Sequence, residues 1–319
     1  MILSLDIGGT KTLWTIWNDG SVIERGTATT NTITDFTEFI QELIDGHHIT
    51  HLAFALAGPV TNDKLELTNT GQIIGIAEIR AAFPDAEVIV LNDLEALAHS
   101  IGHLTEPEHL ILFRSVVSSD AKGSPSGAKA VLSIGTGLGV AAVSREGIVI
   151  PSEGGHIDFA PVGEKQKKIY DKLSAQYGHV SYERLLSGQG LSNIFSIILE
   201  EQEAGDPDAI ACRPRQKMHP AQITAMAKSG NSEAVEAFRI FSEILGAACS
   251  NYALVYMATG GIYIGGGMMP KILPLIDKEA FKNGFLNKGR FKDFINNIPV
   301  YVILDETAPS IGAIKAALL

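Results

Sequence analysis

The chain has 319 residues, of which 45% are hydrophobic, and this length predicts two lobes rather than one core. A formal net charge of −11 without a basic block argues against nucleic-acid binding and against an anionic membrane surface. Two cysteines are too few for a disulfide framework or a cysteine zinc site. The acidic residue Asp6 near the start of the sequence argues against a signal peptide. The lack of a long uncharged apolar stretch argues against a membrane span. We therefore expect a cytoplasmic protein.

Strands and helices alternate along the chain. Apolar and β-branched runs predict strands at Met1–Asp6, Thr12–Trp17, Leu52–Ala57, Val88–Leu91, Ala130–Ile134, Val140–Val143, Gly260–Gly267 and Pro299–Leu304. Apolar spacing of three and four predicts helices at Phe36–Ile44, Glu95–Ile101, Phe238–Val255 and Ser310–Leu319, and a charge run predicts a helix start at Glu164–Lys168. Ser, Gly and Pro predict surface loops at Val117–Gly127 and Gly205–Pro220.

A strand, a glycine and threonine turn and a second strand occur twice, once at the start and once from Ala130. This repetition predicts an internally duplicated chain of two α/β lobes with mixed sheets.

The first glycine turn reads Asp6-Ile-Gly8-Gly9-Thr10-Lys11. Glycines let backbone N–H groups approach phosphate oxygens, and Thr10 and Lys11 can add a hydroxyl donor and a positive charge. Asp6 could hold Mg²⁺ through water. An ordinary hairpin turn explains the two glycines equally well, and the spacing does not match a Walker A loop.

Two further glycine turns also have spacing that suits nucleotide binding. The run Gly135-Thr136-Gly137 would pair with the first turn as a phosphate clamp, with one turn from each lobe. The triple glycine Gly265-Gly266-Gly267 follows a strand and would let a flat adenine ring lie on the backbone. A tight strand-to-helix turn explains the triple glycine equally well.

Asn92 and Asp93 follow a predicted strand, where side chains of α/β proteins commonly face a ligand crevice. Asp93 could act as a base toward an alcohol, with Asn92 fixing a second hydroxyl. The alternative is that Asp93 is only the N-cap of the helix that follows.

The run Glu153-Gly-Gly-His156-Ile-Asp158 offers a carboxylate and an imidazole, which suit the hydroxyls of a polyol. Its two adjacent glycines disfavour a helix, so we predict a loop and no Glu-x-x-His metal site. Asp158 could orient His156. Glu183 stands near a helix start, where the alternative is a carboxylate that interacts with the helix dipole.

Taken together these runs resemble the bacterial glucokinase family of the hexokinase/actin-like ATPase superfamily. The resemblance covers essentially the whole chain, and its most specific runs are Glu153-Gly-Gly-His156 and Glu183-Arg-Leu-Leu-Ser-Gly188. The other matching runs are Asp6-Ile-Gly-Gly-Thr10, Leu91-Asn-Asp-Leu94, Ile134-Gly-Thr-Gly-Leu-Gly-Val140, Gly260-Gly-Ile-Tyr-Ile264 with Gly266-Gly267, and Lys288-Gly-Arg-Phe291 before Ile298-Pro-Val-Tyr301.

This resemblance implies a two-lobed actin-like ATPase (ribonuclease H-like) fold of mixed sheets flanked by helices, with the sites in the cleft between the lobes. The small lobe would be residues 1–103, completed by a C-terminal helix at 304–319, and the large lobe residues 104–303. It also implies a homodimer that transfers the γ-phosphoryl group of ATP, with Mg²⁺, to the 6-hydroxyl of D-glucose at the entry of glycolysis.

The same resemblance implies a role for each matching position. Asp93 would be the general base, and Asn92, Glu153, His156 and Glu183 would bind glucose hydroxyls. Gly8 to Lys11 and Gly135 to Gly137 would flank the phosphates, and Gly265 to Gly267 would lie near adenosine.

Two positions depart from the family pattern. Lys11 stands where the family usually has Asn, and a lysine at this position is more typical of the related ROK sugar kinases. Gln72 stands where a Trp is common in the family. These departures leave open a kinase for another hexose or an amino sugar, such as mannose or N-acetylglucosamine. A non-catalytic sugar sensor is a third possibility, which the acidic chain and an intact Asp93 disfavour.

Overall fold

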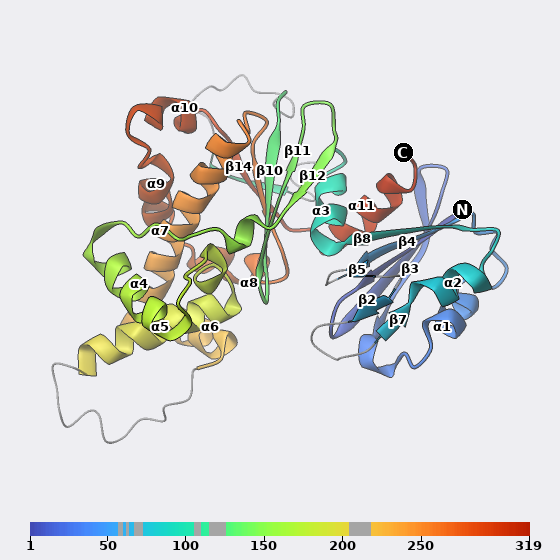
Figure 1. The fold of residues 1–319 in the computed structure, drawn as a ribbon, viewed down its shortest axis with the longest axis horizontal. Helices are drawn as coiled ribbons and strands as arrows, with labels where there is room; N and C mark the ends of the chain where they lie inside the picture. The colour runs from blue at the N-terminus through green and yellow to red at the C-terminus, as the bar shows by residue number, and fades with distance from the viewer. Residues whose placement is uncertain (57–59, 62–63, 67–72, 105–109, 115–125, 204–217) are drawn as a thin grey trace. The chain divides into compact units, whose positions relative to one another are not determined.

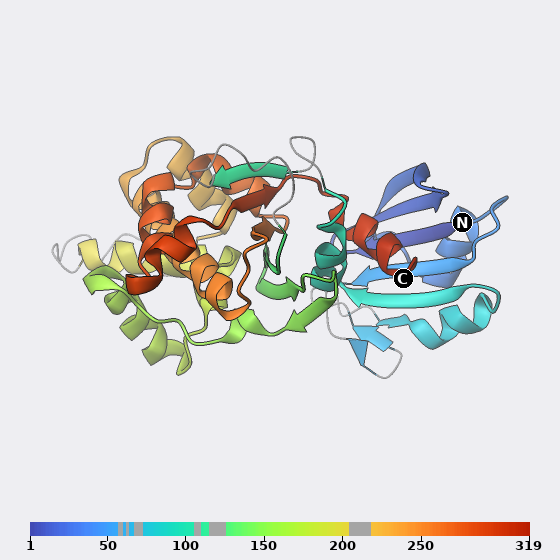
Figure 2. The ribbon, with the colours of Figure 1, turned by 90° about the horizontal axis from the view of Figure 1, so that it is seen from above.

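A computed structural model describes residues 1–56, 60–61, 64–66, 73–104, 110–114, 126–203 and 218–319. The chain divides into two compact units (Figures 1 and 2). The first unit comprises Met1–His109, Gly147–Ile150 and Asp305–Leu319, and the second comprises Leu110–Glu146 and Pro151–Leu304. The lobe boundaries expected from the sequence, at 103/104 and 303/304, stay a prediction. The predicted loops at Val117–Gly127 and Gly205–Pro220 lie largely outside the described residues.

The first unit is built on a five-stranded mixed sheet in the order β3-β2-β1-β4-β8. The predicted glycine hairpin is confirmed, because β1 pairs with β2 antiparallel, and β1, β4 and β8 run parallel. The strands are β1 (Ile2–Ile7), β2 (Lys11–Asn18), β3 (Ser21–Thr29), β4 (His51–Leu56) and β8 (Glu87–Asn92). A small sheet of β5 (Val60–Thr61), β6 (Lys64–Glu66) and β7 (Ile73–Gly75) follows β4 in the chain.

Helices cover both faces of the first sheet, as the alternation of β1 requires. Leu3, Leu5 and Ile7 belong to a core shared with α1 (Phe36–Leu43) and α2 (Ile76–Ala82). The alternate residue Ile2 packs on the other face, in a cluster with residues of α3 (Asp93–Ser100) and α11 (Ala308–Ala316). The sheet is therefore enclosed between two helical layers.

The helices α3 and α11 lie side by side in both views (Figures 1 and 2). Gly312 of α11 permits this approach, because a Cβ there would overlap the carbonyl oxygen of Ala96. Ser310 is buried and donates to Thr15 Oγ1 at 3.0 Å, so the polar groups of α11 are satisfied inside the unit. The C-terminal helix thus holds α3 in place.

The second unit contains a six-stranded mixed sheet in the order β12-β11-β10-β13-β14-β9, although Val149 and Ile150 of β12 are grouped with the first unit. Its second glycine hairpin is also confirmed: β10 pairs with β11 antiparallel and with β13 parallel, as β1 pairs with β2 and β4. The two sheets therefore share a local topology. The strands are β9 (Leu110–Arg114), β10 (Lys129–Ile134), β11 (Leu138–Val143), β12 (Val149–Ser152), β13 (Ile262–Gly265) and β14 (Val300–Ile303).

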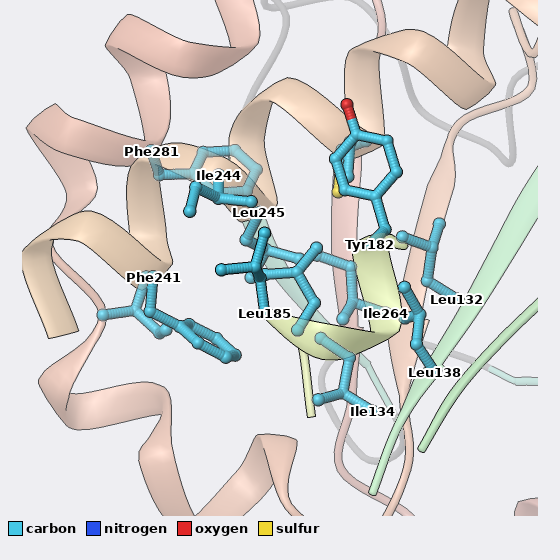
Figure 3. Close-up of a cluster of buried hydrophobic side chains, with 14 of the residues drawn as sticks. Leu132, Ile134, Leu138, Tyr182, Leu185, Phe241, Ile244, Leu245, Ile264 and Phe281 are labelled. Carbon is cyan, nitrogen blue, oxygen red and sulfur yellow. The ribbon is translucent and has the colours of Figure 1, made fainter. Parts of the chain in front are cut away.

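A large hydrophobic core fills the second unit around the long helix α7 (Ser232–Val255). Figure 3 shows Phe241, Ile244 and Leu245 of α7 facing Leu185 and strand residues such as Ile264. The predicted helices at 164–168 and 238–255 are confirmed within α4 (Gly163–Tyr177) and α7. The remaining helices are α5 (Gly188–Glu203), α6 (Pro220–Lys228), α8 (Met269–Ile272), α9 (Lys278–Leu286) and α10 (Lys292–Asn296), with short 3-10 helices between them.

Candidate active site

Asp6 and Asp93 lie at the same edge of the first sheet. Asp6 is in register with Ala55 of β4, and Ala55 is in register with Leu91 of β8, so Asp93 follows β8 at the edge where β1 ends. The carboxyl ends of parallel strands are where α/β folds bind ligands. The sheet therefore brings together two acids that stand 87 positions apart in the sequence.

Burial raises the pKa of both acids. The pKa of Asp6 is raised to about 7, mainly by burial and further by the negative charge of Asp93, while Lys11 acts in the opposite direction. Desolvation also raises the pKa of Asp93, and a hydrogen bond from Leu94 N–H at 2.9 Å partly offsets this.

The suggestion that Asp93 is the N-cap of its helix is wrong. Asn92 is the N-cap: its Oδ1 accepts from Glu95 N–H at 2.7 Å, and Glu95 Oε2 accepts from Asn92 N–H at 3.2 Å. This capping box makes Asp93 the first helical residue, where a carboxylate is not needed as a cap. The cap occupies Oδ1 of Asn92 and leaves its Nδ2 amide as the group that can donate to a ligand.

Lys11 begins β2 and faces the segment before α11. Its Nζ lies 3.6 Å from Glu306 Oε2, and both side chains are exposed, so this ion pair contributes little to stability. The turn between the strands is closed by a hydrogen bond from Gly8 N–H to the Lys11 carbonyl at 3.0 Å. The first glycine turn and Asp6 are thus contiguous with the edge that carries Asp93.

Two glycine turns meet at the edge of the second sheet. Ser133 of β10 is in register with Gly265 of β13, so the turn Gly135–Gly137 and the run Gly265–Gly267 leave the sheet side by side. Gly266 has a φ of +92°, and a Cβ there would overlap the backbone of Ile134. This arrangement brings the predicted phosphate turn and the predicted adenosine run together.

His156 lies between two carboxylates in the second unit. Its Nε2 is 3.9 Å from Glu153 Oε2 and its Nδ1 is 4.0 Å from Glu183 Oε1. These distances exceed a direct hydrogen bond, so the three side chains keep free capacity for a ligand. The run predicted as a loop contains a single 3-10 turn, Gly154–His156, which the two glycines still prevent from extending. The family resemblance implied that Glu153, His156 and Glu183 bind the same sugar, and the structure places the three side chains close together.

The predicted link between Asp158 and His156 is wrong. Asp158 Oδ1 instead lies 2.9 Å from His179 Nε2, on a segment that pairs with the Asp158 segment through a bridge to Ser181. Both members of this pair are largely exposed. Sequence proximity suggested His156 as the partner, but the antiparallel pairing decides the contact.

Glu183 belongs to a short 3-10 helix, Tyr182–Arg184, and its carboxylate serves a distant strand. Oε2 accepts from Leu138 N–H at 3.1 Å, directly after the turn Gly135–Gly137. Gly188 N–H also donates to the Gly135 carbonyl at 2.9 Å. These bonds attach the Glu183 segment to both ends of the glycine turn, and Glu183 also stands in the first turn of its 3-10 helix, so the helix-dipole alternative stays open.

A close contact between Gly155 and the backbone of Leu138 was also not predicted from the sequence. A Cβ at Gly155 would overlap the carbonyl oxygen of Leu138, so the second glycine of Glu153-Gly-Gly-His156 is needed for packing against β11. The adjacent glycines were a usable signal for such contact. Leu138 carried no signal, because its contribution comes from its backbone.

The described residues contain no group of three or more His, Cys, Asp or Glu side chains that could hold a metal ion on their own. The same residues include no helix that is both long and apolar enough to cross a membrane. Leu67–Gln72, with the departure at Gln72, lies outside the described residues.

The fold and the residues described above define the class of protein, which is a sugar kinase of the actin-like ATPase fold. A crystal structure of glucokinase from an Antarctic psychrotroph superposes with a TM-score of 0.84 and 25% identity, covering 99% of this chain and 98% of the other. A ROK family glucokinase from Streptomyces griseus, in complex with glucose and AMPPNP, has a TM-score of 0.59 at 17% identity, covering 98% and 97%.

Sequence comparison gives the particular family. The family described as Glucokinase matches residues 3–318. A glucokinase of Klebsiella pneumoniae (strain 342) is 32% identical over 316 residues, which cover 97% of this chain and 94% of that protein. The chain therefore belongs to the glucokinase family.

Proposed function

We propose residue roles for the phosphorylation of D-glucose by ATP, the reaction that membership of the glucokinase family assigns to this chain. In this proposal Asp93 is the general base, and Asn92, Glu153, His156 and Glu183 bind the sugar hydroxyls. The observation that carries it is the position of His156 between the carboxylates of Glu153 and Glu183. Carboxylates accept and imidazole can donate, so the group matches the hydroxyls of a sugar.

The transfer needs a deprotonated hydroxyl oxygen at the phosphorus. Asp93 accepts the proton of the 6-hydroxyl as the bond from that oxygen to the γ-phosphorus forms and the bond to the β-γ bridging oxygen breaks. The raised pKa of Asp93 makes it a better proton acceptor than a fully hydrated carboxylate. Asn92 Nδ2 donates to a neighbouring hydroxyl and holds the sugar in register with the base.

The glycine turns are proposed to bind ATP. Backbone N–H groups of Gly8 to Lys11 and of Gly135 to Gly137, with the hydroxyls of Thr10 and Thr136, would neutralise phosphate charge. The adenosine would lie against the run Gly265–Gly267, because these glycines at the end of β13 have no side chains to cover the backbone. Asp93 belongs to the first unit, and Glu153, His156 and Glu183 belong to the second.

Mg²⁺ is part of the proposal. Burial and the negative charge of Asp93 raise the pKa of Asp6, and two acids at one sheet edge fit a hard divalent cation. Asp6 would hold the ion through water, and the ion would supply charge neutralisation on the phosphates. We further propose a homodimer that acts in the cytoplasm at the entry of glycolysis.

Replacing Asp93 tests the role of the base. Asp93→Asn can still accept the bond from Leu94 N–H and cannot take a proton, so kcat should fall by roughly 10²–10⁴-fold. Glucose binding, measured by calorimetry without nucleotide, should stay within about threefold of the parent protein. A variant with near-normal turnover would remove Asp93 from this role.

A sugar panel tests the substrate. ADP release should give the highest kcat/KM with D-glucose, compared with mannose and N-acetylglucosamine in the same assay. A better mannose or amino-sugar substrate would replace glucose in the proposal and leave the role of Asp93 standing.

A further inference from the structure

Two consecutive residues near the end of α7 each form a hydrogen bond to one of the sugar-binding segments. Tyr252 Oη donates to the Gly154 carbonyl at 2.6 Å. Asn251 Nδ2 donates to Tyr182 Oη, also at 2.6 Å. Gly154 lies between Glu153 and His156, and Tyr182 directly precedes Glu183. Helix α7 is therefore hydrogen-bonded to the two segments that carry Glu153, His156 and Glu183, the proposed sugar ligands of the second unit.

The geometry of the helix explains how neighbours reach different segments. Successive residues of an α-helix point about 100° apart, so Asn251 and Tyr252 face separate directions from one rigid element. Tyr252 is fully buried, and its ring lies 6.3 Å from that of Tyr182, which in turn lies 5.7 Å from Phe159. Figure 3 shows the hydroxyl of Tyr182 directed away from the surrounding hydrophobic side chains.

The sugar-binding turn is closed by two bonds of its own. His156 N–H donates to the Glu153 carbonyl at 2.9 Å, and Ile157 N–H donates to the Gly154 carbonyl at 3.3 Å. The bond from Tyr252 reaches the Gly154 carbonyl as well, and 3-10 turns of this length have poor internal geometry. The tyrosine hydroxyl therefore attaches the turn that carries Glu153 and His156 to helix α7.

We propose that Asn251 and Tyr252 are positioning residues for glucose, Tyr252 through the turn that carries Glu153 and His156, and Asn251 through Tyr182 and Glu183. This inference rests on the proposed sugar-binding role of those side chains. Neither residue contacts the sugar in this arrangement. Their effect is to hold the sugar groups in the geometry that binding requires.

The protonation of the two phenols suits this task. Burial raises the pKa of Tyr252 well above its usual range, with a further contribution from Tyr182. Burial also raises the pKa of Tyr182, partly offset by the bond from Asn251. Both hydroxyls therefore keep their protons throughout the pH range of sugar phosphorylation.

Tyr252→Phe removes one hydroxyl and keeps the ring in the core. The KM for glucose should rise about five- to tenfold, while the KM for ATP stays within about twofold. Tyr256→Phe is the matched control, because Tyr256 ends the same helix and donates no hydroxyl bond to another described residue. Its two KM values should match those of the parent protein.

A double-mutant cycle separates positioning from a general loss of stability. In a background in which both Glu153 and His156 are replaced by Gln, Tyr252→Phe should add little to the glucose KM, because both side chains that it positions are already replaced. In a Glu183→Gln background the effect of Tyr252→Phe should persist in full. Asn251→Ser should show the opposite dependence, with its effect on the glucose KM lost only in the Glu183→Gln background.

Tyr182→Phe removes the acceptor of the Asn251 bond and keeps all core rings, so it tests the second contact even where Asn251→Ser folds poorly. Equal changes in the KM for glucose and ATP would refute the inference, and so would an effect of Tyr252→Phe that multiplies fully with the combined replacement of Glu153 and His156 by Gln. An active parent protein with an unchanged Tyr252→Phe variant refutes the inference alone. A parent protein without any sugar kinase activity refutes both the inference and the proposed function.

Discussion

The carboxylate of Glu183 accepts a hydrogen bond from the backbone N–H of Leu138 at 3.1 Å. Leu138 begins the strand that follows the turn Gly135–Gly137, so this bond connects a proposed sugar ligand to a proposed phosphate turn within one unit. The other carboxylate oxygen of Glu183 faces His156. A change at the turn should therefore be felt at the sugar side chains.

Gly137→Ala tests this connection. A Cβ at residue 137 would lie 2.5 Å from Glu183 Oε2, so the flexible carboxylate must move away and release Leu138. Losing one charge-assisted hydrogen bond of about 1.5–3 kcal/mol should raise the glucose KM about 10- to 100-fold. The same bond stabilises the folded protein without sugar, so the melting temperature should also fall, by about 3–12 °C.

Gly102→Ala is the control for adding a methyl group at a glycine, because a Cβ there meets nothing within 4 Å. Steady-state kinetics should be unchanged in this control. If Gly137→Ala leaves the glucose KM unaltered, the Glu183 to Leu138 bond does not set the position of the carboxylate during catalysis.

The stability of the nucleotide-free protein should depend on Asp6. An unfolded Asp has a pKa near 3.9, whereas the pKa of folded Asp6 is about 7, so the folded protein holds a proton that the unfolded chain releases. The free energy of unfolding should then fall as the pH rises from about 4 to about 7 and level off above it. The loss has an upper limit of about 4 kcal/mol.

Asp6→Asn removes this penalty because an amide cannot ionise. Melting temperatures measured with a chelator present should show the variant more stable than the parent protein at pH 8 and equal to it near pH 4.5. Its activity should nevertheless fall, since the proposed Mg²⁺ ligand is lost. A stability difference that is the same at both pH values would contradict the raised pKa.

Asp158 should have no role in glucose binding, because it pairs with His179 and not with His156. Asp158→Asn should therefore leave the glucose KM within about twofold, since an exposed pair contributes little. His156→Gln, measured alongside, should raise the glucose KM clearly. Equal effects of the two variants would show that Asp158 does act on the sugar side chains.

The local elements were predictable because their signals are local. The turns Gly8–Gly9 and Gly135–Gly137 stand between alternating apolar runs, which is sufficient to predict a hairpin. The family resemblance likewise rests on contiguous runs and was confirmed by the family match. Grouping Glu153 with His156 required only a short span of sequence.

The errors occurred where spatial pairing decides the outcome. The helix cap is an exception, because the Asn-x-x-Glu spacing from Asn92 to Glu95 is a local signal of the capping box that the prediction overlooked. The bond from Tyr252 to Gly154 joins residues 98 positions apart, and no local pattern carries that information. The Leu138 contact comes from the backbone, which every residue except proline offers alike.

The packing of α11 against α3 orders events during synthesis. Residues 308–316 leave the ribosome after the whole second unit, yet they cover the face of the helix that begins at Asp93. Until then Ala96 and its neighbours on α3 lack their partner, so the growing chain carries an uncovered apolar surface that chaperones can bind. The first unit in chain order is therefore finished after the second, and the helix that begins at the proposed base is covered only once residues 308–316 have been made.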